Sequence, residues 1–276
     1  MAQVKYTILG SSGFIGKNLS KSLFDQKFEA IESNRNHPDW LKNILKNDLG
    51  HVIYCIGLTA DFRKKPFETI DAHICILKDI LKTGNFKSLT YLSSTRVYEG
   101  GLETTEDAIL KVSPINPSHF YNLSKLMGES LCINSAKNVK IIRLSNVYGN
   151  EMNSNNFLCS VLSEAAKTGK VNFQTSPESS KDFISITDVV NLVPKIAVNG
   201  SHSIYNLASG KNTSNKTIAN ILSKEGVGVS FSKDAVDWSF PEIKVDRIKN
   251  EFPYNYEDLA INLANLYKKY HQKAHK

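Results

Sequence analysis

A tyrosine and a lysine lie four residues apart in the stretch Ser118–Glu129, which reads as the start of a helix. Residues spaced i and i+4 share one face of an α-helix, so Tyr121 and Lys125 are expected to lie one turn apart. A free tyrosine has a pKa of about 10 and carries protons poorly at neutral pH. Because a nearby cation favours the phenolate and lowers that pKa, the pair predicts a general acid/base centre. The spacing is common on helices, so the rest of the chain must supply the context.

Five strand-like segments alternate with helical patterns in the first half of the chain. They are residues 4–9, 28–33, 51–56, 88–93 and 139–144. This alternation predicts βαβ units and therefore an α/β fold with a doubly wound, parallel, Rossmann-type sheet. Ligands of such sheets bind at the carboxyl ends of the strands. Gly57, Ser94 and Asn146 follow three of these strands and are therefore candidate site residues.

Three glycines follow the first strand with the spacing G-x-x-G-x-x-G. Gly10 permits a tight turn, Gly13 lets the backbone approach a pyrophosphate, and Gly16 allows close packing of helix on strand. The turn therefore predicts a dinucleotide site. The residues expected to contact the cofactor here are Gly10, Ser12, Gly13, Phe14, Ile15 and Gly16, joined by Gly57 and by the Tyr121 and Lys125 pair.

The end of the second strand selects between the two nicotinamide cofactors. NAD-binding proteins place Asp or Glu there, about 20 residues past the glycines, to hold the ribose 2′-hydroxyl. Counting without gaps reaches Asn34, and Arg35 follows. A neutral residue followed by an arginine suits a 2′-phosphate, so NADP is the expected cofactor. NAD is the alternative, with Glu32 as the acid if the register differs.

The second half of the chain has a looser pattern and predicts a smaller mixed lobe. Its expected elements are helices at 157–167, 186–198, 213–224 and 256–270, strands at 182–185 and 203–207, and loops at 150–156 and 175–181. We therefore expect an NAD(P)-binding domain over residues 1–146, with a return segment near 182–210. A smaller substrate-binding lobe is expected over residues 147–276.

The composition favours small anionic ligands over large partners. The formal charge is +7, from 34 Lys+Arg against 27 Asp+Glu, and the lysines are spread along the 276-residue chain. This balance suits nucleotides and sugar diphosphates and gives no block typical of nucleic-acid binding. No apolar run approaches the roughly 20 residues that span a bilayer, and no signal peptide is expected. The four cysteines lack metal-ligand spacing, which predicts a cytoplasmic protein with reduced thiols and no metal site.

Five ordered motifs together resemble the extended short-chain dehydrogenase/reductase superfamily, in particular its nucleotide-sugar epimerase/dehydratase/reductase group. They are Gly10–Gly16, Ser93-Ser94, Tyr121-x-x-x-Lys125, Arg143–Gly149, and the pair of stretches Lys181–Val190 and Tyr205–Gly210. The resemblance implies a nucleotide-diphosphate sugar as substrate. It also implies a homodimer formed through the two helices near residues 66–81 and 119–137.

The resemblance also implies roles for single residues of the catalytic half. Tyr121 would be the catalytic acid/base, and Lys125 its electrostatic partner, which also contacts the nicotinamide ribose. Ser94 would bind the reacting oxygen and stabilise the charge that develops on it. Asn146 matches a substrate-binding asparagine.

Further candidates for substrate contacts are basic residues and the residues next to Ser94. Those expected to contact the diphosphate from the smaller lobe are Arg143, Lys181 and Arg247. Lys181 stands where the group has arginine and lacks its bidentate fork. Thr95 and Arg96 lie at the mouth of the expected site, where Arg96 is expected to recognise a charged group of the substrate.

Departures from the group's patterns narrow the reaction. Sugar 4,6-dehydratases of the group carry Asp-Glu where this chain has Thr95-Arg96, which supply neither acid nor base for water elimination. Epimerase-reductases resembling GDP-fucose synthase need a cysteine near the serine pair and a histidine after Gly149, and this chain has Thr95 and Asn150–Met152 instead.

What remains is a 4-keto-sugar reductase, or a 4-epimerase that retains NAD. The expected NADP preference and the short chain favour the reductase. A third hypothesis is a non-catalytic cofactor-sensing or RNA-binding relative. It is disfavoured because such relatives commonly lose the tyrosine or the lysine, and both are present.

Overall fold

The computed structural model describes residues 4–33, 37–58, 62–151 and 156–275. The chain forms two compact units, each built from separate stretches of sequence. Unit 1 comprises residues 1–97, 110–144 and 189–206, and unit 2 comprises residues 98–109, 145–188 and 207–276.

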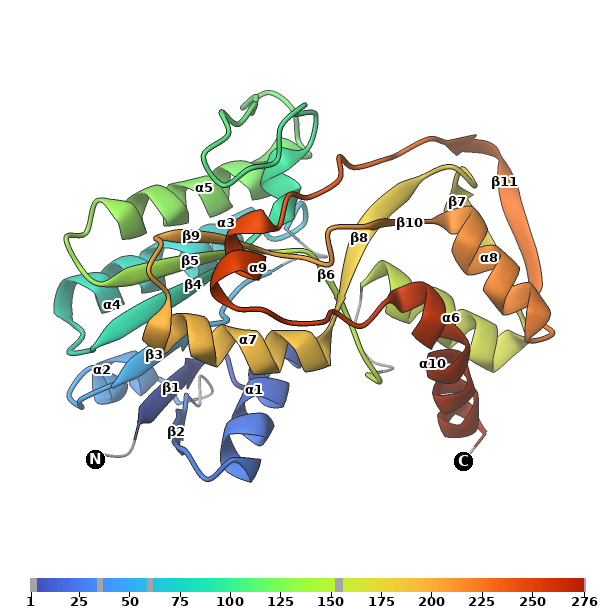
Figure 1. The fold of residues 1–276 in the computed structure, drawn as a ribbon. Coiled ribbons are helices and arrows are strands. Elements are labelled where there is room, and N and C mark those ends of the chain that lie inside the picture. The colour runs from blue at the N-terminus through green and yellow to red at the C-terminus, as the bar shows by residue number, and fades with distance from the viewer. Residues whose placement is uncertain (1–3, 34–36, 59–61, 152–155, 276) are drawn as a thin grey trace. The chain divides into compact units, whose positions relative to one another are not determined.

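Unit 1 is organised around a six-stranded sheet with the order β2-β1-β3-β4-β5-β9 (Figure 1). Its strands are β1 (Lys5–Leu9), β2 (Glu29–Glu32), β3 (His51–Tyr54), β4 (Ser88–Ser94), β5 (Val139–Leu144) and β9 (Ile204–Leu207). The pairings β1 with β2, β1 with β3, β3 with β4 and β4 with β5 are all parallel. The predicted α/β fold with a doubly wound, Rossmann-type sheet is confirmed.

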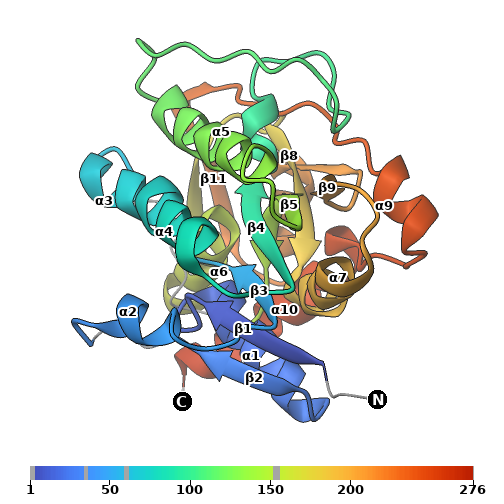
Figure 2. The ribbon, with the colours of Figure 1, turned by 90° about the vertical axis from the view of Figure 1, so that its left-hand side faces the viewer.

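Helices cover both faces of this sheet. They are α1 (Phe14–Asp25), α2 (Trp40–Ile44), α3 (Pro66–Ile70), α4 (Ile76–Thr83), α5 (His119–Ile133) and α7 (Ile186–Asn199). Figure 2 shows α4 and α5 on one face of the strands and α7 on the other. A core cluster that includes Val52, Leu77 and Ile141 fills the space between the strands and α4. On the opposite face, the Ser88 hydroxyl donates a hydrogen bond to the carbonyl of Ala197 in α7.

A π-helical turn, Asp71–Cys75, separates α3 from α4. The single helix predicted for residues 66–81 is therefore wrong in this detail. A π turn inserts one extra residue into the helical repeat and is frequent at functional sites. Here it contains His73, whose side chain is completely buried.

Unit 2 contains two small sheets and the C-terminal helices. Its strands are β6 (Asn146–Tyr148), β7 (Lys170–Thr175), β8 (Ser180–Ser185), β10 (Asn212–Ser214) and β11 (Gly228–Val236). Its helices are α6 (Phe157–Thr168), α8 (Asn215–Lys224), α9 (Asp246–Glu251) and α10 (Leu259–Ala274). One sheet has the order β10-β8-β6, and β11 pairs with β7. Packed side chains of α6, β7, α8 and α10 form its core, with Leu162, Phe173 and Leu263 at most 1% exposed.

Unit 2 also contains the main errors of the sequence prediction. The strands β6, β7, β10 and β11 and the helix α9 were not predicted, and β7 and β8 shorten the loop expected at residues 175–181. Helix α10 begins at Leu259 and not at residue 256, because the side chain of Asp258 caps it by accepting from the Ala260 N–H. Helix α8 begins after Ser214, whose side chain caps it by accepting from the Thr217 N–H.

In the part of the chain that the structure describes, no helix is long and apolar enough to cross a membrane. Nor do three or more His, Cys, Asp or Glu side chains gather there in a way that could hold a metal ion.

Candidate active site

Ser94 and Tyr121 lie together at the carboxyl end of the sheet in unit 1. Ser94 is the last residue of β4, and Tyr121 lies in the first turn of α5. The Ser94 hydroxyl is close enough to the Tyr121 phenol for hydrogen bonding to lower the pKa of that phenol. The structure therefore brings together the two residues expected to contact one reacting oxygen.

The pKa of Tyr121 is not lowered as the sequence predicted. Burial raises it to about 12, and the hydrogen bond from Ser94 and the charge of Arg96 only partly oppose that rise. Lys125 is not among the groups that lower it. The prediction weighed the neighbouring cation and neglected the burial of the phenol, which is the larger effect here.

Lys125 lies one turn beyond Tyr121 and is also buried. Its Nζ donates a hydrogen bond of 2.9 Å to the carbonyl oxygen of Leu92 and lies 5.9 Å from the centre of the Tyr121 ring. Burial lowers the pKa of Lys125 to about 7, against the opposing charge of Glu129. The ammonium is thus poised to change protonation near neutral pH.

Glu129 lies a further turn along α5 and is held by two partners. The Arg143 guanidinium donates to both of its carboxylate oxygens, with Nη2 2.8 Å from Oε2, and the Ser93 hydroxyl donates to Oε1. Both charged side chains are about 5% exposed or less. The prediction that Arg143 contacts a diphosphate from the smaller lobe is wrong, because Arg143 lies on β5 in unit 1 and is engaged by this carboxylate.

His73 was missed by the sequence reasoning and packs directly against Tyr121. The two rings meet edge to face with their centres 5.5 Å apart. The Ser124 hydroxyl donates to the Tyr121 carbonyl and so accepts from His73 Nδ1, 2.8 Å away. His73 Nε2 accepts from the Leu58 N–H. Burial, together with the charge of Lys125, lowers the pKa of His73 to about 2, so the ring stays neutral.

Phe62 and Arg96 enclose the Tyr121 ring from other segments of unit 1. The Phe62 and Tyr121 ring centres are 5.4 Å apart. The Arg96 guanidinium carbon lies 5.4 Å from the Phe62 ring centre and 5.9 Å from that of Tyr121. Thr95 precedes Arg96 at the start of a 3₁₀ turn, Thr95–Tyr98, and is buried. No signal in the sequence indicated the contact of Phe62 with the tyrosine.

The glycine turn has the geometry that a dinucleotide requires. Gly10 has a φ of +90°, which side chains rarely adopt, and a Cβ on Gly16 would lie 2.2 Å from the Gly10 carbonyl oxygen. Gly13 is the N-cap of α1 and has no side chain to occupy the first-turn N–H groups. A helix N-terminus of this kind attracts phosphate. The exposed backbone at Ser12 and Gly13 therefore fits the pyrophosphate of a dinucleotide, and Phe14 and Ile15 begin the helix behind it.

The segments next to the turn support it. The backbone N–H of Gly10 donates to the hydroxyl of Ser33, which ties the turn to the end of β2. Asn34 and Arg35, predicted to select the cofactor, lie outside the described residues. Gly57 is exposed after β3, and a Cβ there would lie 3.2 Å from His73 Nε2 and 3.5 Å from Lys125 Nζ.

The other predicted substrate residues lie in unit 2. Asn146 donates from Nδ2 to the Asp182 carbonyl oxygen, and the Lys181 ammonium lies 3.8 Å from the centre of the Phe157 ring. The guanidinium of Arg247 is ion-paired with Glu106 and Asp107, which are carried by the 98–109 segment of the same unit.

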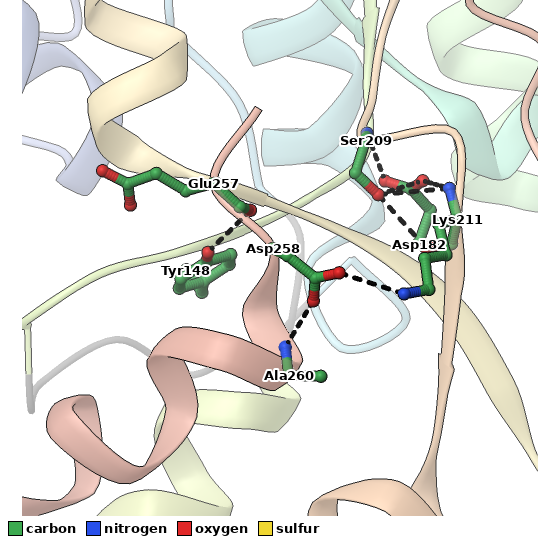
Figure 3. Close-up of polar contacts among 7 residues, drawn as sticks. All are labelled: Tyr148, Asp182, Ser209, Lys211, Glu257, Asp258 and Ala260. Carbon is green, nitrogen blue, oxygen red and sulfur yellow. Dashed lines mark hydrogen bonds and ion pairs between the residues drawn. The ribbon is translucent and has the colours of Figure 1, made fainter. Parts of the chain in front are cut away.

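Asp182 organises the turn between β9 and β10 (Figure 3). Its carboxylate accepts hydrogen bonds from the backbone N–H groups of Ser209, Gly210 and Lys211 and from the Ser209 hydroxyl, at distances of 2.8 to 3.0 Å. Figure 3 also shows the Lys211 ammonium paired with Asp258, the cap of α10, at 3.0 Å. Asp182 thus has a structural role, in which three backbone N–H groups and the Ser209 hydroxyl are held by one carboxylate.

These features define a Rossmann-type fold with the glycine turn of a dinucleotide-binding protein and with a serine and a tyrosine side by side at the carboxyl end of its sheet. A model of the NAD dependent epimerase/dehydratase family matches residues 6–208. The chain belongs to this family. Membership confirms the predicted superfamily, the prediction of an enzyme, and the prediction of a nicotinamide dinucleotide as its cofactor.

Solved structures with the same fold cover nearly the whole chain. RMD from Pseudomonas aeruginosa, complexed with NADPH, is 21% identical with a TM-score of 0.76, over 99% of this chain and 100% of that one. MoeE5 in complex with UDP-glucose and NAD is 16% identical with a TM-score of 0.80, over 98% and 99%. UDP-glucuronic acid 4-epimerase from Bacillus cereus, with UDP-glucuronic acid and NAD, is 17% identical with a TM-score of 0.79, over 98% and 99%. A search of curated protein sequences found no match.

Proposed function

We propose that this protein is an NAD(P)-dependent oxidoreductase that reduces the 4-keto group of a nucleotide-diphosphate sugar. The placement of the Ser94 hydroxyl beside the Tyr121 phenol carries the proposal, because it gathers two donors that can bind one carbonyl oxygen. The structural relatives add support for the substrate class, since two of them were solved in complex with UDP-sugars.

In the proposed reaction, Ser94 donates a hydrogen bond to the sugar oxygen and Tyr121 gives that oxygen its proton. When bound, the reduced dinucleotide supplies the hydride. The residues that would hold it are those of the glycine turn together with Gly57 and Lys125, with Asn34 and Arg35 as the proposed selectors of NADP. Asn146, Lys181, Thr95 and Arg96 are the proposed substrate contacts. Arg247 would have to leave its carboxylate partners to join them.

A phenol raised to a pKa of about 12 by burial is well suited to the reductive direction. Such a group is fully protonated at neutral pH, so every enzyme molecule carries the proton to be donated. Lys125, with a pKa near 7, is the neighbouring group that can take up or release a proton when Tyr121 regains its proton after the reaction. In this proposal Tyr121 holds the proton that is donated, and Lys125 is the group that exchanges protons near neutral pH.

The experiment that tests the function is a spectroscopic screen of reduced-cofactor oxidation. NADPH and NADH are each offered with a panel of nucleotide-linked 4-keto sugars. Tyr121→Phe is expected to lower turnover by about 10²-fold to 10⁴-fold, the usual contribution of general acid/base catalysis, and to retain cofactor binding. Tyr6→Phe, which removes another buried phenol of unit 1, serves as the matched control. Near wild-type turnover in Tyr121→Phe would refute the mechanism.

A 4-epimerase is the second candidate, favoured by the likeness to UDP-glucuronic acid 4-epimerase. The same Ser94 and Tyr121 contact would then serve oxidation and reduction in turn. An epimerase would turn over without added NADPH and would carry bound cofactor through purification. A reductase would consume one added NADPH for each sugar reduced.

The quaternary structure belongs to the same proposal. We infer a homodimer formed through α4 and α5, with the site of each chain complete in itself. Sedimentation measured with and without a charge introduced at Met127, which is 56% exposed on α5, tests this pairing.

A further inference from the structure

Two basic side chains, one lysine and one arginine, flank Tyr121 at the same distance from the centre of its ring. Lys125 Nζ and the Arg96 guanidinium carbon each lie 5.9 Å from the ring centre. They reach the ring from different segments, since Lys125 is on α5 and Arg96 follows β4. Either cation is near enough to act on a charge that forms on the phenol.

The two cations differ in how firmly their charge is fixed. Lys125 gives a hydrogen bond to the Leu92 carbonyl, and its burial lowers its pKa to about 7. It is therefore partly neutral at and above neutral pH. An arginine guanidinium stays protonated throughout the range in which proteins fold. Arg96 is thus the cation whose charge beside Tyr121 does not depend on pH.

Arg96 is held against both members of the Ser94 and Tyr121 pair. Its backbone N–H donates to the Ser94 hydroxyl oxygen at 3.2 Å, while its guanidinium lies over the rings of Phe62 and Tyr121. This N–H therefore helps to hold the Ser94 oxygen beside the phenol. One residue therefore orients the serine through its backbone and approaches the tyrosine through its side chain.

We propose that Arg96 is a positioning residue that acts through Tyr121, its fixed positive charge stabilising the phenolate left after the proton is given to the sugar oxygen. In that step the Tyr121 O–H bond breaks, the proton bonds to the substrate oxygen, and the electron pair stays on the phenolate until a proton returns from solvent by way of Lys125. The inference rests on the proposed function for its role in turnover. The direction of the effect agrees with the charge of Arg96 lowering the pKa of Tyr121.

The other groups around the phenol have a different influence. Those that titrate or carry charge on the surrounding elements are His73 on the π turn, Tyr91 on β4, Lys125 and Glu129 on α5, and Arg63 beside Phe62. His73 is neutral and Tyr91 carries no positive charge. Arg63 lies 4.6 Å from the Phe62 ring centre and hydrogen-bonds the Ser118 hydroxyl, so its guanidinium is the natural control for that of Arg96.

The decisive measurement needs neither substrate nor cofactor. The phenol at position 121 is replaced by 3-chlorotyrosine, which is more acidic than tyrosine and ionises while the protein is folded, and its phenolate absorbance is followed against pH. We expect Arg96→Gln to raise the pKa of this phenol by about one unit, a tenfold change in proton affinity. Arg96→Lys should restore most of the shift, and Arg63→Gln should change the pKa much less. An unchanged pKa in Arg96→Gln would overturn the inference.

Turnover then separates this role from simple substrate binding. Arg96→Gln is expected to lower kcat about tenfold at neutral pH and to move the alkaline fall in kcat to higher pH, because the weaker acid stays protonated longer. A rise in KM with an unchanged pH profile would mean that Arg96 only binds substrate, and would overturn the proposal. If no 4-keto sugar is reduced by any variant, the proposed function fails, and the chlorotyrosine titration still decides whether Arg96 acts on Tyr121.

Discussion

Each unit of this protein contains a carboxylate buried to the same degree, and these two, Glu129 in unit 1 and Asp182 in unit 2, are neutralised by different means. Glu129 in unit 1 and Asp182 in unit 2 are both 3% exposed. Glu129 is met by a formal cation, the bidentate guanidinium of Arg143. Asp182 is met by three backbone N–H groups and the hydroxyl of Ser209.

The difference shows what each carboxylate is for. Neutral donors supplied by consecutive residues fix a turn, but they leave the pKa of Asp182 raised by its burial. The charge pair in unit 1 instead lies one helical turn from Lys125, and the charge of Glu129 raises the pKa of that lysine. In unit 1 a buried charge acts on a group that titrates, whereas in unit 2 it holds local backbone.

The largest effect is expected from removing the Arg143 guanidinium, the cation that neutralises the buried carboxylate of unit 1. Arg143→Met leaves the carboxylate of Glu129 buried without a counter-charge, which is expected to reduce the free energy of unfolding by about 3–5 kcal/mol. Chemical denaturation gives the value. Adding Glu129→Gln to Arg143→Met should recover part of the loss, because the uncompensated charge is then gone. A loss below about 1 kcal/mol, typical of an exposed pair, would mean that the charge is met by other groups.

A pH series on Lys125 tests whether the charges of unit 1 are coupled to a titration. The folded pKa is about 7 and the ordinary value is 10.5, so between these values the unfolded chain binds a proton that the folded chain lacks. The stability of the protein should therefore rise with pH across this window, relative to Lys125→Met, which cannot titrate. The difference in unfolding free energy between the two proteins should change by a few kcal/mol. A pH-independent difference would show that Lys125 keeps its ordinary pKa.

The smallest effect is expected in unit 2. Asp182→Asn keeps one acceptor oxygen but turns an NH₂ group toward backbone donors, which should cost about 1–3 kcal/mol of unfolding free energy. Ser209→Ala is the matched variant, since it removes one neutral donor and keeps the backbone bonds, and should cost about 0.5–1.5 kcal/mol. Equal losses in the two variants would show that the carboxylate itself contributes nothing beyond the serine contact.

The sheet could be predicted because buried strands and helices alternate visibly in the sequence, and the glycine spacing after β1 follows from local backbone geometry. The relation of Tyr121 to Lys125 also follows from helical spacing. The contacts of Phe62, His73 and Arg96 with the tyrosine could not be predicted, since they join segments that are far apart in the chain and only tertiary packing decides them. The pairing of β7 with β11 is likewise non-local.

The direction of the Tyr121 pKa shift could not be predicted from the sequence, for a related reason. Sequence spacing identifies the nearest cation, but burial depends on the whole fold, and burial is the larger cause for both Tyr121 and Lys125. A motif therefore indicates which groups meet, while their protonation depends on the packing around them.

The position of β9 at the edge of the sheet has a consequence for biosynthesis. Between β5 and β9 the chain passes through residues 145–188 of unit 2. During translation the edge of β5 therefore stays unpaired until β9, which ends at residue 207, has emerged from the ribosome. An exposed strand edge is a template for pairing with other nascent chains. A fragment that stops after residue 146 would keep the glycine turn, Ser94 and Tyr121 yet lack α7 and β9. We therefore expect that residues 1–146 expressed without that later segment would not fold as a stable independent unit.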